Sequence, residues 1–157
     1  MTNYGTLHET NGKYTLKFQR LFTQQPEQVY NTMIQPDYFT QWYPFATGEM
    51  EHKEGGRISF DDEEGSIYEG IITKFNPPHV FAFQEVDDLL SIELQPEGKG
   101  CRLVFKHTFA DQSMAVMTAA GWHRCLDALG MLVNGKAVTW PDNGTKLREI
   151  YAETIGV

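Results

Sequence analysis

The sequence predicts an α+β fold in which a curved antiparallel sheet of about six to seven strands wraps around one long helix. Apolar residues alternate in short segments through most of the chain, which is the period-2 pattern of half-buried strands. Two short helices are expected after the first strand, and a long amphipathic helix follows the last one. Such a sheet leaves room for a cavity against the helix, and we expect the function to lie in that cavity.

The first strand is expected over residues 14–23, where alternation places one cation among apolar side chains on the same face: Tyr14, Leu16, Phe18, Arg20 and Phe22. Three prolines then frame two short helices. Pro26 and Pro36 suit a first helical turn, and Pro44 ends the second helix. The apolar residues of these helices are Val29, Tyr30 and Met33 in the first, and Phe39, Trp42 and Tyr43 in the second.

Strands joined by short turns are expected from residue 47 onward, at residues 47–53, 57–61, 66–75, 80–86, 89–95 and 101–109. The acidic run 61–65 lies between two of them. A calcium loop needs ligands spaced around a defined turn, and consecutive acids do not provide that spacing. We therefore interpret this run as a solvated hairpin tip.

The long helix is expected over residues 112–134, where apolar residues recur at helical spacing and Asn134-Gly135 provides a left-handed cap. A further short helix can begin at Asp142 or Asn143. Its apolar stripe, formed by Leu147, Ile150, Tyr151 and Ile155, needs a covering surface. Packing back onto the domain is the simplest interpretation, and a lid over the cavity or a homodimer contact are the alternatives.

Length and composition limit the classes of protein. The 157 residues, 41% of them hydrophobic, predict a single domain over 1–157, with a core at about 14–135 and a helical extension at about 142–156. A net charge of -8 with only 13 Lys and Arg argues against nucleic acid as a partner. The absence of a signal-like or membrane-spanning run predicts a cytoplasmic protein that is not embedded in a membrane. Cys101 and Cys125 lack ligand spacing, so we expect no metal, cofactor or disulfide.

Three ionisable residues fall on otherwise apolar strand faces. Period 2 places His107 with Phe105 and Glu85 with Phe83, and Arg20 lies on the apolar face of the first strand. Burying such groups without partners costs several kcal/mol, so they should pair with one another, reach water in a cavity or lie at its mouth. They form a ligand-anchoring or proton-transfer site, a structural ion pair, or a set of strand-end residues that lean into solvent.

The order of motifs resembles the START-like (SRPBCC) superfamily with its helix-grip fold, and within it the AHSA-type subfamily, named after the activator of the heat-shock-protein ATPase. The resemblance covers residues 18 to about 135. It rests on Arg20, Pro26-Glu27, Val29-Tyr30, Pro36-Asp37, Trp42-Tyr43-Pro44, Glu54-Gly55-Gly56, Tyr68-Glu69-Gly70, Phe75-Asn76-Pro77-Pro78, Gly121-Trp122, Leu126 and Leu129. The chain departs from the family pattern at Gln25 and Tyr43, where Ala and a second Trp are frequent.

The resemblance implies a hydrophobic cavity between the sheet and the long helix. Together with the apolar strand faces, it leads us to expect a protein that binds a small hydrophobic molecule, lipid-like or aromatic, without catalysis. The expected ligand-binding residues are Trp42, Phe60, Tyr68, Ile72, Phe83, Glu85, Ile92, Phe105, His107, Trp122 and Leu126. Two other functions stay open: a stress-related co-chaperone with a heat-shock-protein partner, and a cyclase- or hydrolase-like enzyme using His107, Glu85 and Arg20.

Overall fold

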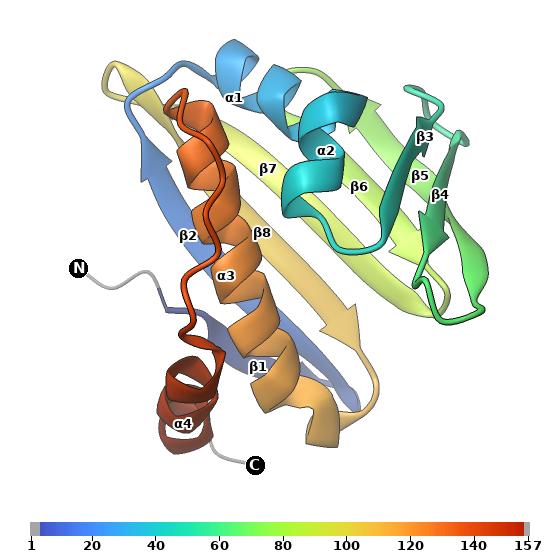
Figure 1. Cartoon of the computed structure of the whole chain (residues 1–157), viewed down its shortest axis with the longest axis vertical. Coiled ribbons are helices and arrows are strands. Elements are labelled where there is room, and N and C mark those ends of the chain that lie inside the picture. Colours follow the sequence, from blue (N-terminus) through green and yellow to red (C-terminus); the bar gives the residue numbers. More distant parts are fainter. Residues whose placement is uncertain (1–3, 156–157) are drawn as a thin grey trace.

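The protein folds into one curved antiparallel sheet that grips a long helix, as seen in a computed structural model that describes residues 4–155 (Figure 1). The sheet has eight strands in the order β1-β2-β8-β7-β6-β5-β4-β3. Their bounds are Thr6–Thr10 (β1), Lys13–Phe22 (β2), Ala46–Met50 (β3), Arg57–Asp61 (β4), Ile67–Asn76 (β5), Val80–Glu85 (β6), Asp88–Glu97 (β7) and Gly100–Phe109 (β8). The predicted α+β fold class is thus confirmed.

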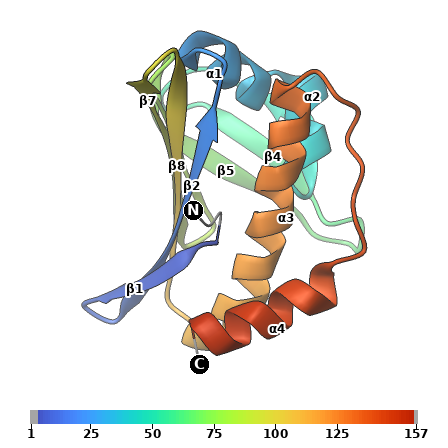
Figure 2. The same ribbon diagram turned by 90° about the vertical axis from the view of Figure 1, so that its left-hand side faces the viewer.

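The helices lie on the concave side of this sheet (Figures 1 and 2). They are α1 (Pro26–Ile34), α2 (Pro36–Trp42), α3 (Ala115–Val133) and α4 (Gly144–Thr154), with a 3-10 turn at Gln112–Met114 before α3. Both early helices begin at the expected prolines. Among the described residues, no helix is long and apolar enough to cross a membrane.

β1 is the strand that sequence reasoning missed, which is why the sheet has eight strands rather than six or seven. Its side chains are mostly exposed, so it lacks the buried face that produces apolar alternation. It pairs with β2 through a turn at Asn11 and Gly12, where φ is 53° and 79°. An Asn-Gly dipeptide is a strong hairpin signal, because such a turn needs left-handed backbone at both positions. That dipeptide was the available clue.

The strand faces are oriented as the alternation predicts. Leu16, Phe18 and Arg20 of β2 are buried, and so are Phe105 and His107 of β8. The bulge in β5 beside Ile72 and the irregular pairing of β3 with β4 add curvature to this sheet. The same alternation buries Arg20 and His107 and leaves Glu85 partly buried, so each of them needs a partner there.

The acidic run between β4 and β5 forms a hairpin tip, as expected. The Asp62 carboxylate accepts hydrogen bonds from the backbone N–H groups of Glu64 and Ser66, and Asp61 accepts one from Glu63. These local bonds lower the pKa of Asp62. The acids therefore serve the turn itself.

α4 packs across the end of α3 (Figure 2), which confirms the simplest of the three interpretations of the C-terminal segment. Leu147 and Tyr151 are buried, while Ile150 and Ile155 are only partly covered. The Tyr151 hydroxyl accepts a 2.9 Å hydrogen bond from the N–H of Gly5 and lies 2.8 Å from His123 Nδ1. One tyrosine thus ties both ends of the described chain to α3.

Candidate functional site

A cleft of about 620 Å³ opens where the turn after α2 faces the middle of α3 and the neighbouring ends of β5, β6 and β8. We call it the aromatic cleft, because six of its lining residues carry phenyl, phenol or indole rings. It is lined by Thr40, Gln41, Trp42, Tyr43, Pro44, Phe45, Tyr68, Glu85, His107, Thr118, Gly121, Trp122, Arg124, Cys125 and Trp140. Both Glu85 and His107 are among them, so the structure brings these two together.

The interior behind this cleft is filled by side chains. Ring centroids lie 4.8 Å apart for Phe105 and Trp122, 5.1 Å for Tyr43 and Trp122, and 4.9 Å for Phe39 and Tyr43. Such distances are those of rings in direct contact. The space between the sheet and α3 is therefore packed at this level, and the open volume lies at its rim.

This packing separates the expected ligand-binding residues into two groups. Trp42, Tyr68, Glu85, His107 and Trp122 line the aromatic cleft. The remaining residues do not: Phe60, Ile72, Phe83, Ile92 and Phe105 are core residues with at most 1% of their surface exposed, and Leu126 lines a second pocket on the other side of α3.

Glu85 is the polar centre of the cleft. It ends β6, where its Oε2 accepts a 3.2 Å hydrogen bond from the Tyr43 hydroxyl, and the Tyr68 side chain lies near enough to affect this carboxyl. Burial raises the pKa of Glu85 to about 7, and the charge of Asp88 adds to this rise. The two tyrosine hydroxyls oppose it by stabilising the carboxylate. Near neutral pH the carboxyl is therefore present in two forms: an ionised form that accepts hydrogen bonds and a protonated form that can donate one.

Burial also keeps the two tyrosines protonated. It raises the pKa of Tyr68 to about 12 and that of Tyr43 well above its ordinary value, with the Glu85 charge contributing to both. A protonated phenol can donate to the Glu85 carboxylate. These three side chains form one polar cluster at the wall of the cleft.

His107 is held by protein groups at both ring nitrogens. Trp122 Nε1 donates a 2.8 Å hydrogen bond to His107 Nδ1, so the proton of the neutral ring is on Nε2. Nε2 in turn donates to Asp88 Oδ2 across 2.8 Å. Burial lowers the pKa of His107, while Asp88 opposes that shift. With both nitrogens occupied, His107 positions Trp122 and Asp88 and has no free nitrogen for proton exchange with a ligand.

Arg20 lies away from the cleft, so the sequence hypothesis of a site using Arg20 together with Glu85 and His107 lacks one member. Its guanidinium is 3.3 Å from Asp127 Oδ1 and donates weakly to the His123 carbonyl oxygen at 3.5 Å. Burial lowers its pKa, and Asp127 opposes the shift. Arg20 thus belongs to a cluster between β2 and α3.

Two bulky residues at the cleft have left-handed backbone. Phe45, in its lining, has a φ of 65°, and Val86, between Glu85 and Asp88 in the β6–β7 turn, has a φ of 55°. Side chains with this backbone cost of order 1–3 kcal/mol each and occur often at functional sites. Both are also exposed, so neither conformation is enforced by core packing.

The α3 side of the cleft combines open space with a covered cation. A Cβ built on Gly121 would meet no atom within 4 Å. The Arg124 guanidinium lies 5.6 Å from the Trp140 ring and donates to the Pro141 carbonyl oxygen, while its buried Nε has no hydrogen-bond partner in the described part of the chain. Burial raises the pKa of the Cys125 thiol to about 12, so this thiol is not a ready nucleophile.

Sequence reasoning missed Arg124 and Trp140 as cleft residues and Asp88 as the partner of His107. Asp88 had a usable signal, because a two-residue turn at Val86-Asp87 places it opposite Glu85. Arg124 and Trp140 had none, since a helix cation and a loop indole have no periodic pattern. In residues 4–155, no three His, Cys, Asp or Glu side chains come together to hold a metal ion.

A sheet gripping a helix, with an aromatic cleft at the rim, is the architecture of a helix-grip domain. Residues 23–134 match the family described as activator of Hsp90 ATPase homolog 1-like protein. The chain belongs to this family, as its sequence motifs led us to expect. No curated protein sequence matches it significantly.

Solved structures with the same fold are similar in shape and distant in sequence. A conserved protein of unknown function from Enterococcus faecalis has a TM-score of 0.83 at 17% identity, over 95% of this chain and 88% of that one. CalU16 from Micromonospora echinospora has a TM-score of 0.75 at 17% identity, over 99% of this chain and 98% of that one. The Aha1 dimer from Colwellia psychrerythraea has a TM-score of 0.62 at 17% identity, over 76% of this chain and 95% of that one. At such identities the likeness establishes the fold alone.

Proposed function

We propose that the protein binds a small aromatic molecule carrying a polar group in the aromatic cleft. The observation that carries this proposal is the position of Glu85, which accepts a hydrogen bond from Tyr43, on the wall of a cleft lined by six aromatic side chains. Ligand sites are typically apolar clefts of about 300–1,000 Å³ with a few fixed polar groups. The cleft volume of about 620 Å³ lies within that range.

Each part of the cleft has a role in this binding mode. Trp140, which is 47% exposed, provides stacking surface, and the buried Trp122 forms part of the apolar wall. The Glu85 carboxyl accepts a hydrogen bond from a ligand hydroxyl or amine when ionised, and donates one when protonated. A ligand without a polar group would leave the buried carboxyl facing an apolar surface, which is unfavourable.

An aromatic ligand is favoured over a lipid chain. A long acyl chain needs a deep tunnel, and the interior behind Tyr43 and Trp122 is packed with rings in contact. A flat aromatic molecule with one or two rings needs only the open space at the rim. Binding without catalysis is favoured because His107 has both nitrogens engaged and Cys125 is a protonated thiol.

Titration with 2-naphthol tests this proposal, with laurate as the lipid-like comparison. Gly121→Leu is the decisive variant, because the Cβ of a residue there enters open space in the cleft. It also replaces a glycine inside a helix, which should stabilise α3 by up to about 1 kcal/mol. We expect 2-naphthol affinity to fall at least roughly tenfold while the melting temperature holds or rises.

Met117→Leu is the matched control, because Met117 is an exposed α3 residue outside the cleft lining. It should bind 2-naphthol as the unmodified protein does. Equal affinity for 2-naphthol in the Gly121→Leu variant would reject the cleft as the binding site. Tighter binding of laurate than of 2-naphthol would reject the aromatic class of ligand.

A second candidate, an interaction with a heat-shock protein, is supported by the name of the family and by the likeness in fold to the Aha1 dimer from Colwellia psychrerythraea. It predicts that the purified protein changes the ATPase rate of a purified Hsp90. An unchanged rate at a several-fold molar excess of this protein would count against it. Gly121→Leu separates the two functions, because blocking the cleft should leave such an interaction unaffected.

A further inference from the structure

β2 has an edge that is only half covered. β1 pairs with it from Lys13 to Lys17, and within the described residues no other strand pairs with this edge beyond Lys17. The chain leaves the sheet at Gly5, whose N–H donates to Tyr151 and whose Cα lies against the Phe18 ring. Residues 18–22, about 16 Å of strand, therefore present alternate backbone N–H and C=O groups outward.

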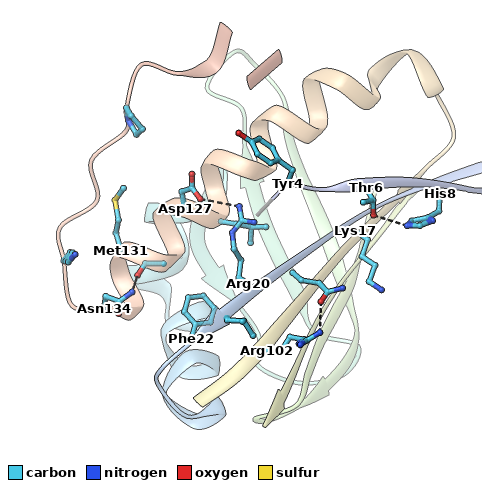
Figure 3. A pocket seen from close by; sticks show the side chains of 16 residues that line it. Tyr4, Thr6, His8, Lys17, Arg20, Phe22, Arg102, Asp127, Met131 and Asn134 are labelled. Carbon is cyan, nitrogen blue, oxygen red and sulfur yellow. Dashed lines mark hydrogen bonds and ion pairs between the residues drawn. The ribbon is translucent and has the colours of Figure 1, made fainter. Parts of the chain in front are cut away.

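A pocket of about 830 Å³ lies along this uncovered edge, bounded by β2, α3 and the segment after α3 (Figure 3). Figure 3 shows Lys17 and Arg102 on one side of β2, while Arg20 extends on the other side toward Asp127. The pocket thus reaches both faces of one strand. A space of this shape suits an extended backbone with side chains alternating to either face better than it suits a compact ligand.

The charge of this pocket is opposite to that of the protein. Four of the chain's 13 Lys and Arg residues line it: Lys17, Arg20, Arg102 and Lys136. Of the 21 Asp and Glu residues, only Asp127 is among the described residues that line it. Arg20 is engaged with Asp127, and Arg102 with Glu97 at 2.7 Å. Within the described residues neither Lys17 nor Lys136 makes an ion pair.

The two faces of the edge differ in chemistry. Alternation places Lys17 with Gln19 on the outer face, where Gln19 also bonds Arg102 of β8 at 2.9 Å. The inner face offers Phe22, with Leu126 and Met131 of α3 behind it. A strand added here would place every second side chain beside Lys17 and Arg102, and the others beside Phe22 and the Arg20–Asp127 ion pair.

We propose that the uncovered edge of β2 binds an extended segment of another protein, in which acidic and apolar residues alternate, by addition of a strand to the sheet. Backbone hydrogen bonds to residues 18–22 provide affinity, and the acidic side chains face Lys17 and Arg102. A second copy of this chain fits poorly in the same place. Two-fold pairing of β2 with itself around Arg20 would bring two guanidinium groups together.

The test uses a fluorescent, end-capped peptide of alternating Glu and Val, eight residues long, titrated with the full-length protein. We expect binding that weakens with salt and is lost when every Glu is replaced by Gln. Two further peptides are N-methylated, one at every Val and one at every Glu. Because alternate N–H groups point to the same edge of a strand, strand addition predicts that only one of these two peptides loses binding.

Arg102→Glu and Lys146→Glu make the same change of charge, the first in the pocket and the second on exposed α4. We expect Arg102→Glu to lower the affinity for the Glu-Val peptide roughly tenfold and Lys146→Glu to have little effect on it. Three outcomes each overturn the proposal: no binding of this peptide at millimolar concentration, equal loss in both variants, or equal binding of both N-methylated peptides. The last would indicate attraction by charge alone.

Discussion

Trp122 donates its indole N–H to His107 Nδ1 across 2.8 Å, and this one contact sets the tautomer of the histidine. The imidazole proton must then lie on Nε2, where it bonds Asp88. One helix and two strands, α3, β8 and β7, are linked by these three side chains. The hydrogen bond from Trp122 stabilises neutral His107, because a protonated ring would turn Nδ1 into a second donor facing the indole N–H.

Replacement of Trp122 by Phe should raise the pKa of His107. The variant removes the donor that favours the neutral ring, and the smaller side chain admits water, so both effects act in the same direction. Loss of the hydrogen bond and of indole packing should lower the free energy of unfolding by about 1–3 kcal/mol. Histidine NMR titration and urea denaturation measure the two effects. Trp140→Phe, at an indole 47% exposed, should change neither, and a lowered His107 pKa in Trp122→Phe would contradict the assignment.

Asp88→Asn should lower two pKa values together. The Asp88 charge raises the pKa of His107 and also raises that of Glu85, so an amide in its place removes both contributions. The asparagine oxygen can still accept the His107 Nε2 proton, which preserves the geometry. Histidine and carboxyl NMR titrations measure both shifts in one sample. Asp87→Asn, at the exposed neighbouring position, is the control, and a shift confined to one of the two groups would contradict a shared origin.

The fold was accessible from sequence because its information is periodic. Strand alternation placed Phe105 and His107 on one face, and helical spacing placed Trp122 and Leu126 on another, as the structure has them. β1 was missed because an exposed, polar strand has no such period. Its one local signal, Asn11-Gly12, indicates a turn but does not show which face of the strand is buried.

The candidate site was accessible only in part. Glu85 and His107 could be found because a polar residue breaks an apolar alternation. Their partners Tyr43 and Trp122 looked like ordinary core aromatics, since nothing local to them specifies which polar atom they meet. Whether the interior was open or filled depended on the summed volume of many side chains, which no local pattern encodes.

Glu85→Gln should stabilise the protein at high pH and not at low pH. The pKa of Glu85 is raised from its ordinary value of 4.5 to about 7 in the folded state, so the folded protein binds this proton more tightly than the unfolded chain. The contribution of Glu85 to stability is therefore fully present below pH 4.5 and is lost as the pH rises through 7. A glutamine does not ionise and avoids that loss.

The expected gain is about 1–2 kcal/mol at pH 8, less than a shift of this size implies, because an amide oxygen accepts less strongly from Tyr43 and Tyr68. Urea denaturation at pH 5 and pH 8 measures it. Glu49→Gln is the control, at an exposed position of β3. Its free energy of unfolding should differ from that of the unmodified protein by the same amount at pH 5 and at pH 8. A Glu85→Gln variant that is less stable at pH 8 than at pH 5, relative to the unmodified protein, would contradict a raised pKa.

Tyr151→Phe tests how the C-terminal helix is held. The missing hydroxyl leaves the buried N–H of Gly5 without its acceptor and removes the partner of His123 Nδ1, at a cost of about 1–3 kcal/mol. The phenyl ring still fills the space beside Phe18, so loss of packing contributes little. Amide hydrogen exchange should show faster exchange at Gly5 and in α4 than in β8.

Tyr38→Phe separates the hydrogen bond from the general loss of a hydroxyl, because the side chain of Tyr38 is 42% exposed on α2 and its hydroxyl makes no hydrogen bond within the described residues. It should change the free energy of unfolding by less than about 0.5 kcal/mol. The predicted pattern requires protection at Gly5 to fall in Tyr151→Phe alone. If exchange at Gly5 is unchanged while α4 loosens, the tyrosine acts through His123 and α3, and the N-terminal segment is held by the packing of Gly5 against Phe18.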